Sequence, residues 1–267
     1  MRNESRTVSN RVYHMSDSAS SHMRSDSVSN NRRMVVRRQK IALTSIALIA
    51  IIMIISVEER YELARHCIRL MKVTGGIHTK AYGQENIPEE GGYMMYPNHQ
   101  GKYDALGIVY THRKPCSIVM DKAKSNTILV KEFIDLLEGK RLDKKDVRQA
   151  LTIINEVSED VKNGKCYILF PEGGYDFNNR NHVCDFKAGS FKIALKTKAP
   201  IIPVALIDSY RVFNSFWLGP VTTQVHYLKP ILFEEYGSLR TQEIAALVKD
   251  RINEKISEVL ASQPISG

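Results

Sequence analysis

Short apolar runs, separated by segments with helical spacing, set the strongest limit on how this chain folds. Such runs cover residues 93–96, 117–120, 166–170 and 200–207. Strands that are apolar along their whole length are buried on both faces, which is typical of a parallel sheet covered by helices. We therefore expect an α/β domain with a mixed, largely parallel central sheet flanked by helices.

Two segments with alternating polarity extend this sheet. Residues 77–82 alternate as a first strand after Gly75 and Gly76. Residues 221–232 also alternate, and this segment contains Pro230. Proline cannot donate a hydrogen bond to a neighbouring strand, so we expect the second segment to lie at a sheet edge.

Helical spacing accounts for the connections. Residues 128–137 have a broad apolar face, and residues 241–261 carry an apolar stripe that we interpret as core cover, with a partner interface as the alternative. Asp146 and Gln149 form a capping pair that opens another helix, which we expect to end at Gly164.

A histidine and an aspartate five residues apart follow the run that ends at Tyr96. On one continuous helix, five residues turn the second side chain about 140° away from the first, so His99 and Asp104 can meet only if the chain bends. Gly101 supplies the bend. We expect a strand, a loop carrying His99, and a helix whose first turn holds Asp104. The carboxylate would then accept one ring proton and leave the other nitrogen to act as a base. The alternative is an ordinary histidine in a polar loop.

Four blocks of sequence resemble the phospholipid/glycerol acyltransferase family, typified by the lysophosphatidic acid acyltransferases. Asn98-His99-(four residues)-Asp104 matches the Asn-His-x4-Asp block of that family, and residues 170–173 match its Phe-Pro-Glu-Gly block. Residues 139–144 stand where the family has Gly-x-x-x-Asp-Arg, and residues 199–204 match its last apolar, proline-containing block. The resemblance covers about residues 77–232. Without it, residues 170–174 would be interpreted as a strand exit with a solvated glutamate.

The resemblance implies a fold like that of glycerol-3-phosphate acyltransferase and an O-acyltransferase activity. A fatty acyl group would move from a thioester, acyl-CoA or acyl carrier protein, to the free hydroxyl of 1-acylglycerol-3-phosphate, giving phosphatidic acid. His99 would be the catalytic base and Asp104 its partner, with no cofactor beyond the thioester co-substrate. The substrate-binding residues implied are Asn98, Lys144, Phe170, Pro171, Glu172, Gly173, Gly174 and Pro203.

Two departures from the family pattern concern the acceptor. Lys144 replaces an arginine, and Tyr175 stands where Phe-Pro-Glu-Gly-x-Arg has another. Both arginine positions are associated in the family with the acceptor's phosphate, which here would rest on Lys144 with Arg180 or Lys187. Lysine lacks the bidentate fork of arginine. The alternatives are therefore an acyltransferase for another lysophospholipid or glycerolipid, or a non-catalytic membrane lipid-binding protein of the same fold. Acyl-chain length, the donor's carrier and the oligomeric state stay open.

Charge and cysteine usage narrow the partners. The net charge is +9, and residues 1–40 supply +6 of it from nine Lys/Arg against three acidic residues. This basic region lacks interleaved aromatics and precedes an apolar run, which favours anionic lipid over nucleic acid. The four cysteines form no Cys-x-x-Cys pair and no metal-type spacing with the eight histidines, so we expect reduced thiols and no metal site.

The N-terminal region predicts a membrane anchor. Residues 1–33 are a basic, Ser-rich segment that we expect to be disordered, residues 34–74 an anchoring segment, and residues 75–267 the catalytic domain. Residues 41–57 are uncharged, and 17 residues lie at the lower limit for spanning a bilayer. Basic residues before this run place its N-terminal side in the cytosol, and residues 61–73 mix apolar and basic residues as an interfacial helix does.

We therefore expect a helical hairpin in one leaflet of the cell membrane, with the catalytic domain on the cytosolic face. A single-pass anchor and a buried core helix are the alternatives.

Overall fold

The computed structural model describes residues 56–127, 129–213 and 219–262. The predicted tail, residues 1–33, lies outside these ranges, and so does the apolar run 41–57 apart from Ser56 and Val57. Within the described residues, no helix has both the length and the apolar character needed to cross a membrane.

One seven-stranded sheet forms the centre of the described part of the chain, in the order β1-β7-β6-β2-β5-β3-β4. Every neighbouring pair is parallel except β6 and β7, so β1 and β7 run against the other five. This is the mixed, largely parallel sheet that the sequence predicted. The strands are β1 (Ile77–Tyr82), β2 (Tyr93–Pro97), β3 (Cys116–Asp121), β4 (Lys140–Leu142), β5 (Cys166–Leu169), β6 (Ile201–Ile207) and β7 (Val221–Tyr227).

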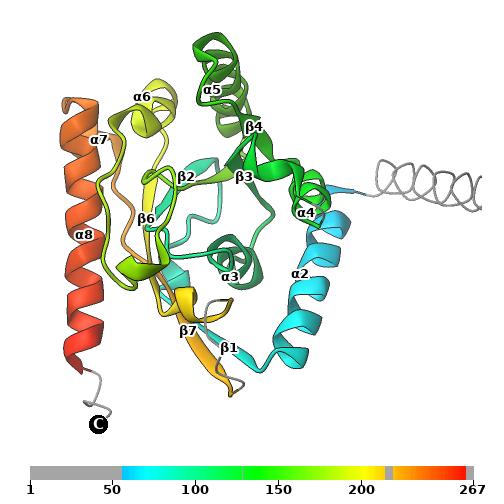
Figure 1. The fold of residues 1–267 in the computed structure, drawn as a ribbon. Helices are drawn as coiled ribbons and strands as arrows, with labels where there is room; N and C mark the ends of the chain where they lie inside the picture. The colour runs from blue at the N-terminus through cyan, green and yellow to red at the C-terminus, as the bar shows by residue number, and fades with distance from the viewer. Residues whose placement is uncertain (1–55, 128, 214–218, 263–267) are drawn as a thin grey trace, which may run out of the picture. The chain divides into compact units, whose positions relative to one another are not determined.

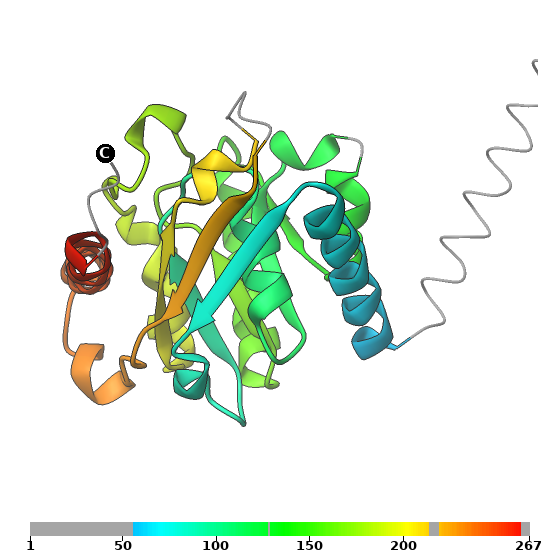
Figure 2. The ribbon, with the colours of Figure 1, turned by 90° about the horizontal axis from the view of Figure 1, so that it is seen from below.

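Helices cover both faces of the sheet, as Figures 1 and 2 show. Buried side chains of α2 (Val57–Thr74), α3 (Asp104–Thr111) and α4 (Val130–Leu136) share one hydrophobic cluster with one face. Those of α5 (Val147–Lys162), α6 (Lys192–Thr197), α7 (Phe233–Tyr236) and α8 (Thr241–Ser262) share a second cluster with the other. The predicted helix start and end are confirmed: the Asp146 side chain accepts from the backbone of Gln149, and α5 ends just before Gly164. The Gln149 side chain does not complete the predicted pair, because it bonds the backbone of Asp143 and Arg141 instead.

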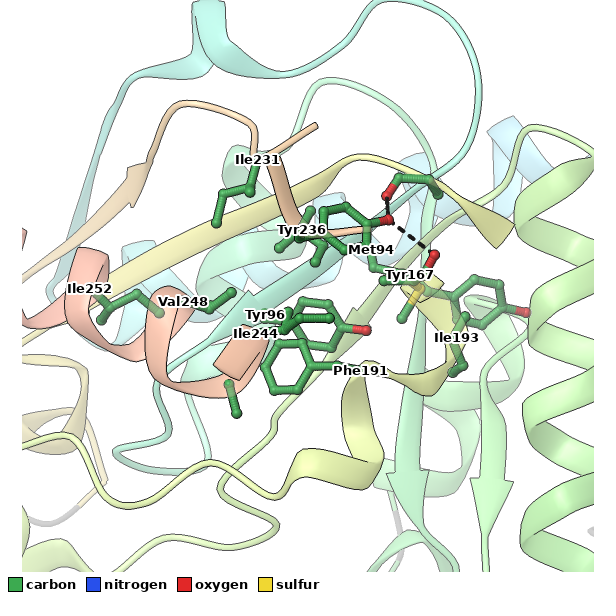
Figure 3. Packing of buried hydrophobic residues seen from close by; sticks show 14 of the residues in the cluster. Met94, Tyr96, Tyr167, Phe191, Ile193, Ile231, Tyr236, Ile244, Val248 and Ile252 are labelled. Atoms are coloured by element: carbon green, nitrogen blue, oxygen red, sulfur yellow. Dashed lines mark hydrogen bonds between the residues drawn. The ribbon is translucent and has the colours of Figure 1, made fainter. Parts of the chain in front are cut away.

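The second cluster shows why the C-terminal helix packs where it does. Ile244, Val248 and Ile252 are fully buried on one stripe of α8, as Figure 3 shows. Tyr96 of β2 and Phe191 pack together below them with ring centroids 4.4 Å apart. Truncating a buried isoleucine to alanine typically costs about 2–5 kcal/mol, so this stripe contributes a large part of the domain's stability. Core cover, the predicted role of the stripe, is confirmed.

The helix α2 and the sheet belong to the same compact unit of the chain. This unit begins at Ser56. Ser56 and Glu59 form a capping box at the start of α2. One face is buried against α3, where the Tyr61 hydroxyl donates to the Val109 carbonyl at 3.0 Å. The outer side leaves three large apolar residues exposed: Leu63, Leu70 and Val73. The segment predicted as an interfacial helix is thus also packed on the domain that carries the sheet.

Two expectations about the sheet were wrong. The strand from residue 221 is not at an edge, because β7 lies between β1 and β6. The strand is also shorter than the predicted range 221–232, since β7 ends at Tyr227 and the chain beyond pairs separately through Ile231 and Ile201. The edge strand β4 was missed because Lys140–Leu142 is short and lies in a charged run.

Candidate active site

The five parallel strands β2 to β6 have their carboxyl ends on the same side of the sheet. The loops that follow these ends carry most of the predicted site residues. His99 follows β2, residues 171–174 follow β5, and Lys144 follows β4. Lys124 follows β3 and Ser209 follows β6. The crevice outside the carboxyl ends of parallel strands is the usual ligand site of open α/β sheets.

The imidazole of His99 and the carboxylate of Asp104 are in contact, as the spacing predicted. Nδ1 of His99 lies 2.7 Å from Oδ2 of Asp104. The chain bends between them so that the backbone N–H groups of Gln100 and Gly101 donate to the same oxygen, at 2.5 and 2.9 Å. Asp104 is completely buried at the start of α3. The loop therefore wraps its backbone donors around the carboxylate.

This arrangement fixes the tautomer of His99. Oδ2 of Asp104 accepts hydrogen bonds from two backbone N–H groups, so this oxygen is an acceptor. Its contact with the ring therefore needs a donor on the ring, and Nδ1 carries the proton. Nε2 then presents a lone pair, and no described residue hydrogen-bonds it. The ring stacks on Phe170 at a centroid distance of 4.2 Å and meets the edge of Tyr175 at 4.6 Å. The side chain is 17% exposed, so Nε2 is the part of the ring that can meet a substrate.

Glu172 braces the same loop from the neighbouring strand. Its Oε1 accepts the backbone N–H of His99 at 2.9 Å. Its Oε2 is buried without a hydrogen-bond partner among the described residues, although the thiol of Cys184 lies beside the carboxyl. Burial raises the pKa of the Glu172 carboxyl, and the hydrogen bond from His99 partly opposes that effect. The side chain thus joins two loops and keeps one oxygen available for a donor.

Three lysines surround the turn at Gly173 and Gly174. Lys144 donates to the Gly173 carbonyl at 2.6 Å and pairs with Asp121 at 2.8 Å, a contact that lowers the pKa of Asp121. The chain of Lys187 crosses Gly173, where an added Cβ would lie 2.6 Å from its Nζ and where φ is +74°. Only glycine accepts both conditions easily.

The third lysine, Lys124, comes from the short 3₁₀ turn after β3. Its Nζ lies 5.2 Å from the ring centroid of Tyr175 and 3.8 Å from the position of a Cβ added to Gly174. No sequence pattern marks Lys124 as part of the site, because it lies 50 residues from Gly174 in the turn that it approaches.

The other predicted substrate-binding residues have mainly structural contacts. The amide of Asn98 is fully buried and bonds both the N–H and the carbonyl of Leu206, at 2.7 and 3.1 Å. Pro203 is buried in β6 opposite Tyr96, and Pro171 is buried after β5. Arg180 is exposed with φ of +48°, and no described contact joins it to the glycine turn. Their roles toward a substrate stay predictions.

The described residues were also considered as metal ligands. The described residues hold no cluster of three or more His, Cys, Asp or Glu side chains that could bind a metal ion. All four cysteines are free thiols.

Comparisons with known proteins test the resemblance that the sequence blocks indicated. Residues 78–207 match the family model described as Acyltransferase. This part of the chain is therefore similar to the acyltransferase family. It includes every strand that contributes a loop to the candidate site. The resemblance found in the four sequence blocks is thereby confirmed.

Two curated relatives carry the same name, 1-acyl-sn-glycerol-3-phosphate acyltransferase. The protein from Saccharomyces cerevisiae is 28% identical over 211 residues, covering 76% of this chain and 68% of the relative. The protein from Borreliella burgdorferi is 24% identical over 197 residues, covering 73% of this chain and 78% of the relative.

A solved structure shows the same fold. The crystal structure of the 1-acyl-sn-glycerophosphate acyltransferase PlsC from Thermotoga maritima superposes with a TM-score of 0.63. The two proteins are 22% identical, and the match covers 78% of this chain and 81% of the other. The described part of the chain therefore has the fold of that structure, which confirms the predicted fold.

Proposed function

We propose that this chain transfers a fatty acyl group from a thioester donor to the free hydroxyl of 1-acylglycerol-3-phosphate, giving phosphatidic acid for phospholipid biosynthesis. The observation that carries the proposal is the contact of 2.7 Å between His99 and Asp104, which leaves Nε2 as the only ring nitrogen that can act on a substrate. The names of the relatives from yeast and Borreliella burgdorferi support the choice of acceptor.

The residues at the site provide the base that the reaction needs. Nε2 of His99 takes the proton of the acceptor hydroxyl as its oxygen attacks the thioester carbonyl carbon, and Asp104 stabilises the imidazolium that forms. Collapse of the tetrahedral intermediate forms the ester and breaks the carbon–sulfur bond. The leaving thiolate takes the proton back from His99, so the enzyme needs neither a nucleophile of its own nor a cofactor.

The acceptor's phosphate is assigned to the lysines around the glycine turn. Lys144 is held by Asp121 and the Gly173 carbonyl, so its charge is partly neutralised. Lys124 and Lys187 approach the same turn from two other elements. Together they offer the positive charge that the two family arginines would supply, in a form without bidentate geometry.

Tyr175 favours a second candidate, an acyltransferase for another lysophospholipid or glycerolipid. Its ring occupies the space beside His99 where the family pattern has an arginine, and it brings no formal positive charge. An acceptor without a terminal phosphate would need fewer cations at this place.

Action at a membrane is part of the proposal. The exposed apolar residues of α2 follow the predicted apolar run in the sequence, which fits a membrane-bound enzyme with the domain on the cytosolic face. Cysteines placed just before residue 41 and just after residue 73 should both be labelled only from the cytosolic side. Labelling from opposite sides would establish a spanning helix.

The test of the activity uses purified full-length protein in lipid vesicles, labelled acyl-CoA or acyl carrier protein, and three acceptors. We expect 1-acylglycerol-3-phosphate to be used in preference to a lysophospholipid with a larger head group and to a neutral monoacylglycerol. Equal use of the neutral acceptor would mean that no phosphate site operates and would favour the second candidate. No transfer to any of the three would favour the non-catalytic lipid-binding alternative.

A further inference from the structure

The carboxylate of Asp104 is buried, and its two oxygens are served by different parts of the chain. Oδ2 receives the three donors of the His99 loop. Oδ1 receives the hydroxyl of Ser209, with an oxygen–oxygen distance of 2.5 Å. Ser209 is only 3% exposed and stands 105 positions further along the sequence, directly after β6.

From this contact we infer that Ser209 is a positioning residue of the proposed acyl transfer, acting through Asp104 and not on the substrate. The inference rests on the proposed function only for its kinetic readout. A carboxylate can rotate about its last bond, and a donor on Oδ1 holds the plane in which Oδ2 faces His99. A hydroxyl that donates to a carboxylate makes one of the stronger hydrogen bonds in proteins, with the short distance seen here.

The segment around Ser209 holds the hydroxyl in place. Gln100 accepts the backbone N–H of Ser209 at 3.0 Å through the side-chain oxygen that also lies 2.9 Å from the hydroxyl. The preceding residue, Asp208, has φ of +62°, a conformation that side chains rarely adopt. Asn181 supports it by accepting the Asp208 N–H at 2.9 Å and donating to its carboxylate at 3.0 Å.

The same contacts tie the His99 loop to the end of β6. Gln100 also donates to the Leu206 carbonyl and to Asn181, both at 2.9 Å. A loop that carries one catalytic histidine is thereby fixed to a neighbouring strand through a buried network in which each described member is hydrogen-bonded. Such networks define one geometry, because breaking any bond leaves a buried polar group unsatisfied.

The test combines kinetics with a direct view of the His99 ring. Ser209→Ala in the full-length protein should lower kcat about ten- to a hundredfold, the usual value of a hydrogen bond to a charged group, while KM for both substrates changes less than about twofold. In an Asp104→Asn background, the same substitution should change kcat less than about twofold, since the partner through which it acts is gone.

The matched control is Ser158→Ala. Ser158 is fully buried and its hydroxyl donates to the Ile154 carbonyl of its own helix at 2.6 Å, away from the site. This variant loses the same atom from the protein interior and should keep wild-type kinetics. Thermal unfolding of each variant confirms that the protein assayed is folded. Should Ser209→Ala not fold, Ser209→Cys, whose thiol is a weak donor, takes its place with the same outcomes.

The proton on Nδ1 of His99 gives a readout that does not depend on turnover. With histidines labelled by ¹⁵N, its resonance, assigned by its loss in His99→Gln, should move or be lost to exchange in Ser209→Ala and stay unchanged in Ser158→Ala. An unchanged resonance together with unchanged kcat would overturn the inference, and so would equal losses of kcat in the two backgrounds. Absence of transfer by the wild type would overturn the proposed function instead, and the resonance would still decide the role of Ser209.

Discussion

The two sides of the candidate site use their hydrogen bonds differently. On the side of β2 and β6, the buried carboxylate of Asp104 is satisfied at both oxygens, and all its donors come from the protein. On the side of β5, the carboxylate of Glu172 is also buried, but only one oxygen has a partner among the described residues. The turn that follows it, at Gly173 and Gly174, is approached by three lysines.

This difference separates two tasks. A fully satisfied carboxylate holds one geometry, which suits a histidine that must present the same nitrogen in every cycle. A carboxylate with one oxygen that accepts no hydrogen bond from the described residues, near a glycine turn that three lysines approach, offers acceptors and donors to a ligand. We therefore assign proton transfer to the first side and recognition of the acceptor head group to the second.

The largest effect on activity should come from a change of Asp104, the carboxylate whose two oxygens are both hydrogen-bonded. Asp104→Asn replaces an oxygen acceptor by an amide that can no longer orient and stabilise the imidazolium. We expect kcat to fall about 10²- to 10⁴-fold with little change in KM. Steady-state kinetics on protein of verified fold measure this, and an unchanged kcat would remove Asp104 from the mechanism.

The next largest effects should come from substitutions of the lysines near Gly173 and Gly174, on the side assigned to the acceptor head group. Lys124→Ala should raise KM for 1-acylglycerol-3-phosphate about fivefold, the value of one exposed charged contact of about 1 kcal/mol, with a smaller effect on the acyl donor. Lys144→Ala should raise the same KM and also lower kcat, because Lys144 holds the Gly173 carbonyl.

Lys162→Ala is the control for both variants, since this lysine pairs with Glu159 at the far end of α5. A neutral acceptor should show no change in KM with Lys124→Ala. If both acceptors respond alike, the lysine does not recognise a phosphate.

Tyr175→Arg tests whether this side has lost a charge or replaced it. We expect kcat/KM for the phosphate acceptor to stay within about threefold of wild type or to rise, because an arginine adds a bidentate donor beside the lysines. Kinetics with the three acceptors measure the change. A loss greater than tenfold would mean that the tyrosine ring itself supports His99, against whose edge it packs.

The smallest effect concerns stability. Burial raises the pKa of the Glu172 carboxyl above its ordinary value of 4.5, so ionisation of this group lowers the free energy of unfolding. The loss is absent below pH 4.5 and grows as the pH rises through the raised pKa. Glu172→Gln keeps an acceptor for His99 and should raise the free energy of unfolding at pH 7 by about 1 kcal/mol. Denaturation at pH 7 and pH 4 checks this, and a gain of equal size at both pH values would contradict it.

Local sequence predicted the contact between His99 and Asp104. His99 and Asp104 are five residues apart, and a single bend at Gly101 determines whether they meet. The family and the sheet were also predicted correctly, because buried strands and four ordered blocks leave a direct record in the sequence. Confirmation of the fold does not extend to the predicted membrane hairpin, which lies largely outside the described residues.

Contacts between distant segments were not predictable in the same way. Ser209 and Lys124 meet the site only through the order of the strands, and neither stands in a motif. Pro230 was misleading because it lies beyond the end of the strand that it was taken to place at the sheet edge. Glu172 was expected to face the acceptor, and its bond to the His99 backbone depends on β2 and β5 being neighbours.

The most direct test of the account compares wild type with His99→Ala in one assay of phosphatidic acid formation from an acyl thioester and 1-acylglycerol-3-phosphate. The wild type should form the product, and the variant, with an unchanged circular dichroism spectrum and unchanged vesicle binding, should lose at least about a hundredfold in rate, since a positioned base contributes that much. A variant within about tenfold of wild type would contradict the central claim that His99 is the base of this acyl transfer.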